Sequence, residues 1–276
     1  MQSRRNLLKR GFACGLAPVF LSGQTQTEAP FLDVIRVPDD VAVYSEGGAL
    51  HPKRSGTRWQ TEGMRVTTEP GNDLRIALSA PDTQVMRIHL RWKGSVSEKW
   101  RFLGDAWERS YGDLEWRVLD GERVLPWYFL MSNGDHTHCY GVKTGSAAFC
   151  FWQADTSGVS LWLDVRNGSE AVQLGERELA VAAVVASRGE PGVSALHAAK
   201  AFCRRMCEHP RLPDHRLYGS NNWYYTYGKD FGPENILRDS ELIAEVSPAA
   251  ATNRPYMVID MGWGGAPDGA GPMTKT

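Results

Sequence analysis

Several features that would assign a chain to a class at once are absent from this sequence. It has no internal repeat and no low-complexity run, so a repeat architecture is not expected. The formal net charge is only −1, so the sequence shows no electrostatic footprint of a nucleic-acid-binding protein. The apolar run at residues 12–21 is too short to span a bilayer. At 276 residues, the chain is long enough for one large or two medium domains.

Cysteine is scarce, and its spacing indicates no disulfide framework. Four cysteines follow the amino-terminal region: Cys139, Cys150, Cys203 and Cys207. Cys203 and Cys207 lie four apart on an expected helix, but no matching pair of ligands is evident. His136 and His138 would share one face of a strand, so they are either zinc ligands or ordinary loop and edge histidines. We expect no metal ion and no organic cofactor.

The amino terminus carries an export pattern. Residues 3–11 (SRRNLLKRG) match the twin-arginine motif, and the apolar run at 12–21 follows directly. Residues 1–29 are therefore predicted to be a twin-arginine signal peptide, the alternative being a merely basic, disordered terminus. Cys14 lies near the start of the apolar run, and Gly11 stands where a lipid-attachment motif would have Leu, so no stable membrane anchor is expected. The predicted location is periplasmic or extracellular, where disulfides are permitted.

Residues 30–190 show the period-two pattern of a β-sandwich. In residues 86–92, Met86, Ile88, Leu90 and Trp92 alternate with polar residues, and residues 159–166 repeat the pattern. The further predicted strands are 73–79, 115–119, 123–130, 147–152 and 179–186. Turn signals such as Asp120-Gly121 separate them, which indicates one large antiparallel sandwich. Eight of the chain's ten tryptophans lie in this region, and they either fill its core or, as is common in sugar-handling proteins, contact a ligand.

A helix is predicted after the sandwich. Ser194 can cap it, and its expected apolar stripe is formed by Leu196, Ala199, Cys203 and Met206. His209-Pro210 ends the helix. We interpret residues 191–215 as a linking helix between two domains.

Residues 216–276 have the pattern of one strand, helix, strand unit. Pro233 begins a helix with apolar residues at about 3.6-residue spacing. Residues 256–259 are a continuous apolar run, typical of a parallel strand buried on both faces. Asp260 follows that run directly, and α/β barrels place their working side chains at the carboxyl ends of such strands.

Two segments resemble the first and second barrel strands of the α-galactosidase (melibiase) clan of glycoside hydrolases. They are residues 221–225 (NNWYY) and 254–263 (RPYMVIDMGW), and residues 140–168 resemble the amino-terminal β-sandwich of bacterial members. The resemblance implies a mainly β fold: a large antiparallel β-sandwich, the linking helix, and the truncated start of a (β/α)8 barrel. A complete barrel needs about 250 residues, far more than follow residue 215.

The same resemblance implies an exported glycoside hydrolase that cleaves terminal α-glycosidic bonds by a retaining mechanism with two carboxylates. The family's catalytic aspartates lie on later strands, so none can be assigned in this chain. Trp223, Asp260 and Trp263 match the family's substrate-binding positions: an indole beside the sugar, an aspartate accepting bonds from hydroxyls, and a second tryptophan. The alternative, purely structural roles are core packing for Trp223 and helix capping or loop structure for Asp260.

Met261 departs from the family pattern, which has a second aspartate there. A thioether is a poor acceptor, so we expect specificity for a sugar other than galactose. The implied partner is an oligosaccharide or glycoside substrate, and a homo-oligomer remains open. The alternative function is a non-catalytic carbohydrate-binding or assembly module built on the sandwich. A reading frame that continues past Thr276 with further strand-end aspartates would favour the enzyme.

Export provides the first testable prediction. Replacing Arg4 and Arg5 together by Lys keeps the positive charge but removes the twin-arginine pair. We expect the precursor to remain in the cytoplasm, as measured by cell fractionation and immunoblotting. A mature form in the periplasm of this double variant would contradict the prediction.

Overall fold

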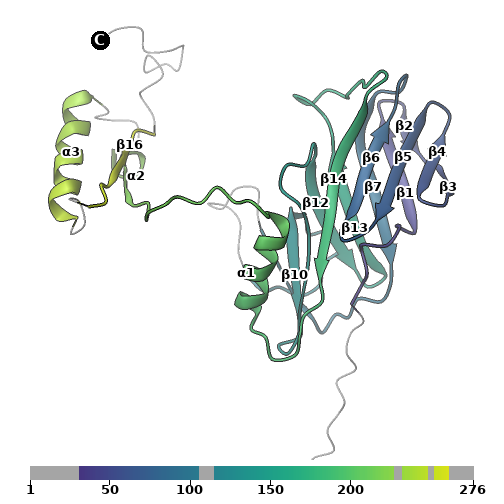
Figure 1. The fold of residues 1–276 in the computed structure, drawn as a ribbon, viewed down its shortest axis with the longest axis horizontal. Helices are drawn as coiled ribbons and strands as arrows, with labels where there is room; N and C mark the ends of the chain where they lie inside the picture. Colours follow the sequence, from purple (N-terminus) through teal and green to yellow (C-terminus); the bar gives the residue numbers. More distant parts are fainter. Residues whose placement is uncertain (1–30, 106–114, 227–231, 248–251, 261–276) are drawn as a thin grey trace, which may run out of the picture. The chain divides into compact units, whose positions relative to one another are not determined.

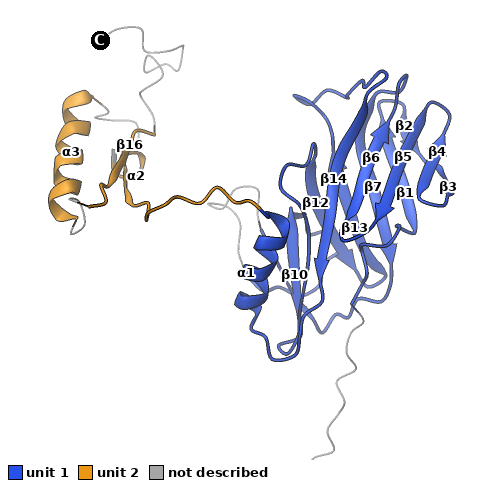
Figure 2. Ribbon diagram, in the orientation of Figure 1, with its two compact units in different colours: residues 1–208 blue, residues 209–276 orange. Residues whose placement is uncertain are grey.

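The computed structural model describes residues 31–105, 115–226, 232–247 and 252–260. The chain divides into two compact units, residues 1–208 and residues 209–276 (Figure 2), and each is considered by itself. The predicted signal peptide and Trp263 lie outside the described residues.

The first unit is an antiparallel β-sandwich, which confirms the mainly β fold (Figure 1). One sheet has six strands in the order β2-β1-β7-β13-β12-β9, and the other has eight in the order β3-β4-β5-β6-β14-β11-β10-β8. The six-stranded sheet comprises β1 (Asp40–Ser45), β2 (Gly48–Leu50), β7 (Val85–Lys93), β9 (Leu125–Pro126), β12 (Phe149–Asp155) and β13 (Gly158–Asp164). The eight-stranded sheet comprises β3 (Lys53–Ser55), β4 (Arg58–Thr61), β5 (Met64–Pro70), β6 (Leu74–Ser79), β8 (Arg101–Gly104), β10 (Tyr128–Ser132), β11 (Thr137–Val142) and β14 (Glu178–Ser187).

The predicted alternation holds in β13 and, with one exception, in β7. The four predicted inward residues of the 159–166 segment are all buried, and so are Ile88, Leu90 and Trp92. Met86 is only half-buried, and Val85 takes the inward position instead. The reason is a bulge: the pairing of β1 with β7 shifts register between Tyr44 and Ser45, so Val85 and Met86 together face Ser45.

Aromatic side chains fill the space between the two sheets. Trp92, Trp152, Phe129 and Tyr140 are fully buried, and their rings meet at centroid distances of 4.8 to 6.0 Å. Both indole N–H groups have acceptors, because Trp92 Nε1 donates to the Arg36 carbonyl at 2.9 Å and Trp152 Nε1 to the Trp127 carbonyl at 3.2 Å. These tryptophans therefore belong to the core and not to a ligand site.

The strand predicted at residues 123–130 divides between the two sheets at Trp127. Residues before it form β9 in the six-stranded sheet, and residues after it form β10 in the eight-stranded sheet. Trp127 has a φ of 63°, an uncommon conformation for a residue with a side chain. Its N–H donates to Cys150 of β12, while its carbonyl accepts from Val142 of β11, so the residue bonds to both sheets. The hydrogen bonds on either side of the crossing hold this conformation in place.

The prediction of a strand at residues 115–119 was wrong. Only an isolated bridge joins Arg117 to Phe102, and Trp116 and Val118 are exposed. Polar and apolar residues alternate here, but among the described residues this single bridge is the segment's pairing with β8.

Helix α1 (Ala195–Met206) packs on the sandwich. Ser194 caps it as predicted, because its hydroxyl accepts from the His197 N–H. The predicted apolar stripe was partly wrong, since Leu196 and Cys203 are exposed. Phe202 is instead the buried residue, in a cluster with Leu130, Cys139 and Val185 of the sheet. Small Ala198 and Ala199 beside Phe202 allow the close approach that a row of larger residues would prevent.

The second unit contains a parallel strand pair and helices. It comprises β15 (Gly219–Asn221), α2 (Trp223–Thr226), α3 (Pro233–Val246) and β16 (Tyr256–Val258). β15 pairs with β16 in parallel, as the strand, helix, strand prediction required. Burial of β16 on both faces was not observed, since Tyr256 and Val258 are 51% and 48% exposed. Among the described residues, this two-stranded sheet packs against helix α3 alone, which covers one face.

The two units should differ in local stability. No hydrophobic residue after Phe202 is buried, among those whose burial the structure describes, and α3 has no buried residue. A helix of about 12 to 15 residues without a buried face barely forms in water. We therefore expect amides after Leu212 to exchange faster, and that segment to be cleaved sooner, than β7 and β13. The measurement is hydrogen exchange with limited proteolysis on the purified chain, and equal protection of the two regions would contradict it.

Candidate functional site

The parallel pairing brings the ends of two strands together. The register places Gly219 opposite Tyr256 and Asn221 opposite Val258, so Asp260 emerges beside the residues that follow Asn221. The pairing depends on Gly219, because a Cβ at that position would lie 1.8 Å from the carbonyl oxygen of Tyr256. Any other residue would push the strands apart, so the glycine fixes the geometry of the strand ends.

Asn221 connects the strand ends through both atoms of its amide. Its Nδ2 donates to Asp260 Oδ2 at 2.8 Å, and its Oδ1 accepts from the Trp223 backbone N–H at 2.8 Å. One side chain thus holds the carboxylate in orientation and begins helix α2. The Asp260 side chain is exposed, and its Oδ1 has no partner among the described residues. That oxygen can accept a hydrogen bond from a ligand.

Asn222 fixes the loop from the other side. It is fully buried, its backbone N–H donates to the Val258 carbonyl at 3.3 Å, and its Oδ1 accepts from the Asp260 N–H at 3.1 Å. The backbone and the side chain of Asp260 are therefore each held by one of two consecutive asparagines. The sequence pattern placed these asparagines in the segment that resembles the first barrel strand, but it did not predict this role. The signal for it was the pair of adjacent amides directly before a tryptophan.

The structure brings together two of the three predicted site residues. Trp223 is the first residue of α2, is half-buried, and connects to Asp260 through the amide of Asn221. Trp263 lies outside the described residues, as does Met261. Trp223 and Asp260 thus follow the ends of two neighbouring strands, and the Asp260 carboxylate is exposed to solvent.

A second contact ties the helices of this unit together. The Tyr225 hydroxyl of α2 donates to Asp239 Oδ2 of α3 at 2.7 Å. Partial desolvation and the hydrogen bond to this carboxylate raise the pKa of Tyr225 to about 12. The bond holds the Asp239 side chain of α3 against α2. The phenol therefore stays neutral at physiological pH and acts here as a hydrogen-bond donor.

Cys139, Cys150 and His138 of the sandwich are buried in its packing. Burial raises the pKa of the Cys139 thiol to about 12 and that of Cys150 to about 11, so both remain protonated thiols. His138 is buried against Trp100, and its Nδ1 accepts from the Gly189 N–H at 2.9 Å. Within the described ranges, no group of three or more His, Cys, Asp or Glu residues could hold a metal ion. In the same ranges, no helix has the length and apolar character needed to cross a membrane.

Comparison with known proteins finds distant similarity in structure and none in sequence. No protein-family model matches the chain, and no curated protein matches it in sequence. Among solved structures, a GH31 family sulfoquinovosidase from E. rectale, in complex with the aza-sugar inhibitor IFGSQ, aligns with a TM-score of 0.34 at 12% identity. The alignment covers 73% of this chain and 35% of that one, so the chain spans about a third of the neighbour's length. A glycoside hydrolase is thus a weak structural neighbour, and similarity at this level carries no argument about activity.

The role of Asn221 can be tested by removing its amide. In Asn221→Ala, the Trp223 N–H loses its acceptor and Asp260 loses its donor. A hydrogen bond contributes roughly 1 kcal/mol net, so exchange of the Trp223 amide should quicken about fivefold. The measurement is hydrogen exchange resolved to single residues. Ser220→Ala, the preceding position on β15, is the matched control and should leave that amide unchanged.

Proposed function

We propose that this chain is the sandwich-bearing part of an exported glycoside hydrolase of the α-galactosidase type, acting on terminal α-glycosides. The observation that carries the proposal is the pairing of Asn221 with Asp260 at the carboxyl ends of two parallel strands. The sequence resemblance assigns these strands to the start of a (β/α)8 barrel, whose sites lie at that end. In this proposal, the strand pair begins the barrel and the sandwich precedes it.

The proposed binding chemistry uses two surfaces of one sugar. Asp260, held at Oδ2 by Asn221, offers Oδ1 to a sugar hydroxyl. An ionised carboxylate is a strong acceptor for hydroxyl groups. Trp223, fixed at its backbone by the same Asn221, presents an indole to the apolar C–H face of the ring. The preorganised amide lowers the entropic cost of binding, because the carboxylate is oriented before the sugar arrives.

The proposed reaction is hydrolysis with retention of anomeric configuration. Such enzymes place two carboxylic acids about 5 to 5.5 Å apart, one attacking the anomeric carbon and one protonating the leaving oxygen. In the family that the sequence resembles, both acids come from later barrel strands. Asp260 is assigned to substrate binding, so its removal should weaken binding without removing the nucleophile. The proposed site of action is the periplasm or the extracellular space, reached through the twin-arginine signal at residues 1–29.

The proposed substrate is a terminal α-glycoside of a sugar other than galactose. Met261 stands where the family has its second aspartate, and its thioether cannot replace the carboxylate as an acceptor of hydroxyl bonds. A site that lacks an acceptor for one hydroxyl no longer prefers the sugar that carries that hydroxyl over sugars that lack it.

Ligand-observed NMR on the purified chain tests the proposed site. A panel of methyl α-glycosides should include at least one sugar that binds, and methyl α-galactoside should not bind tightest. Asp260→Asn weakens the acceptor and should lower affinity by about tenfold. Glu245→Gln, the same change of charge at an exposed position of α3, is the matched control and should bind like the parent chain.

Three results would count against the proposal. Equal binding by Asp260→Asn and the parent chain would remove Asp260 from the site. Tightest binding of methyl α-galactoside would show that Met261 does not alter specificity. Binding that perturbs only residues of the sandwich would favour the alternative, a non-catalytic carbohydrate-binding module.

A further inference from the structure

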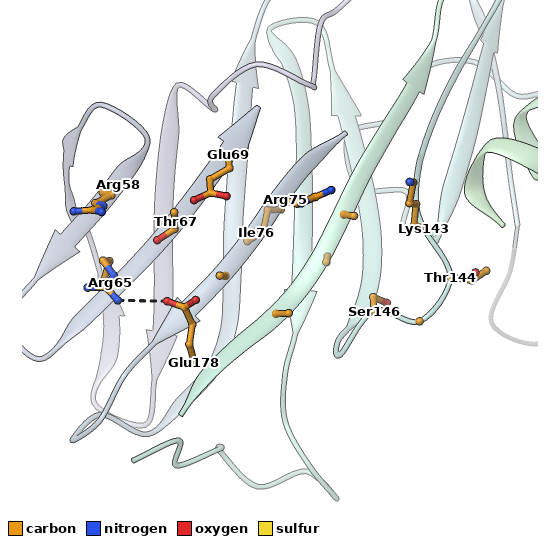
Figure 3. Close-up of a pocket in the computed structure, with 15 residues that line it drawn as sticks. Arg58, Arg65, Thr67, Glu69, Arg75, Ile76, Lys143, Thr144, Ser146 and Glu178 are labelled. Atoms are coloured by element: carbon orange, nitrogen blue, oxygen red, sulfur yellow. Dashed lines mark hydrogen bonds and ion pairs between the residues drawn. The ribbon is translucent and has the colours of Figure 1, made fainter. Parts of the chain in front are cut away.

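A charged groove lies on the solvent-facing side of the eight-stranded sheet, in the first unit (Figure 3). It has a volume of about 530 Å³. Strands β4, β5, β6 and β14 contribute to it, together with the turn at residues 143–146. The opposite face of these strands packs into the core, since Val66, Leu74 and Leu78 are buried. The groove is therefore built on a rigid scaffold, and it shares no residue with the site around Asp260.

The sheet register gives the groove a floor of small residues. Thr67 of β5 pairs with Ala77 of β6, and Ala77 pairs with Ala180 of β14, so the three lie in one row across the sheet. Arg58 of β4 pairs with Thr67 and ends the row. Three steps between neighbouring strands, each about 4.8 Å, make the row roughly 14 Å long. That length suits a short chain of sugar rings or an extended segment of similar size.

Two guanidinium groups stand at the β4 end of the floor. Arg58 is exposed and makes no ion pair with any residue that the structure describes. Arg65 lies diagonally across from it, two positions from Thr67 on β5, within reach of a long side chain. Arg65 pairs with Glu178 at 3.3 Å, and both side chains are substantially exposed. An exposed pair of this kind contributes little, so a ligand anion can replace the carboxylate.

The cations at the other end of the groove are already engaged. Lys143 Nζ lies 2.7 Å from Glu208 and 2.9 Å from Asp73, and these partners raise the pKa of the lysine. Asp73 also pairs with Arg75 at 3.3 Å. Lys143 and Arg75 therefore share two carboxylates, whereas Arg58 has none. The excess positive charge of the groove lies at Arg58 and Arg65.

We propose that this groove binds an anionic oligosaccharide, with a uronate carboxylate or a sulfate ester held between Arg58 and Arg65. The sugar rings lie over Thr67, Ala77 and Ala180, where small side chains leave room for them. Thr67, Thr144 and Ser146 offer hydroxyls, and Glu69 offers an acceptor, so the hydroxyls of the sugar find partners along the walls. Guanidinium groups suit carboxylate and sulfate because their donors form a planar fork.

The groove favours a sugar over other anionic polymers. Its floor strands β5, β6 and β14 are paired on both sides, so an extended peptide lying there could not bind by adding a strand to the sheet. No aromatic side chain lines the groove, which leaves the bases of a nucleic acid without a stacking surface. Glu69 and Glu178 would also repel a closely spaced phosphate backbone.

Isothermal titration of the full chain with defined probes tests this assignment. The probes are trigalacturonate, a sulfated carrageenan tetrasaccharide, neutral maltotriose, and an octapeptide of alternating Glu and Ser. We expect binding of at least one acidic sugar, weakened by added salt, with maltotriose and the peptide binding far more weakly. The two acidic sugars distinguish a carboxylate site from a sulfate site. No binding of either acidic sugar, or tighter binding of the peptide, would overturn the proposal.

Three variants locate the binding. Arg58→Gln should lower the affinity for the acidic sugar by about tenfold, because it removes the cation that has no ion pair. Arg101→Gln makes the same change on β8, at the far edge of the same sheet, and should have no effect. Glu178→Gln removes the carboxylate that competes for Arg65 and should raise the affinity two- to threefold. Equal affinity in all three variants would overturn the assignment. The three substituted residues are not among those assigned to the proposed site at Asp260.

Discussion

The first unit depends on the burial of large aromatic side chains between two sheets. Trp92, Trp152 and Phe129 occupy the same interior layer, and removing such side chains from water is the dominant favourable term in folding. The buried indoles also need acceptors for their N–H groups. The acceptor of Trp152 is the carbonyl of Trp127, the residue at which the chain passes from one sheet to the other. Core packing and topology are thus joined at one position.

Burial of one face of each strand determines what the other face can do. Successive side chains of a strand point to opposite sides, so a buried Val66 or Leu78 requires that Arg65, Thr67 and Ala77 face solvent. The groove is therefore a consequence of the same alternation that builds the core. Its floor is wide because small residues align across three strands, and its charge lies at one end because two arginines meet diagonally.

The second unit relies on short-range constraints, because its described residues bury little apolar surface. Gly219 allows the close approach of two parallel strands, and two asparagines then fix Asp260 by its side chain and its backbone. Hydrogen bonds of this kind orient groups precisely but contribute about 1 kcal/mol each to stability. The unit is thus organised around the geometry of its strand ends more than around a core.

The sequence by itself determined the elements whose signal is local. Alternation predicted β7 and β13, Ser194 predicted the start of α1, and Pro233 predicted α3, because periodicity and capping act within a few residues. It also predicted that Trp223 and Asp260 follow two neighbouring strands. Only the tertiary structure decided the bulge that buries Val85 and the division of a strand at Trp127. It also decided that Phe202, and not Leu196, is the residue of α1 buried against the sheet. It likewise decided the bond from Asn221 to Asp260 and the row from Arg58 to Ala180. Each of these joins residues distant in the chain, and pairing register and packing between such residues leave no periodic trace in either segment alone.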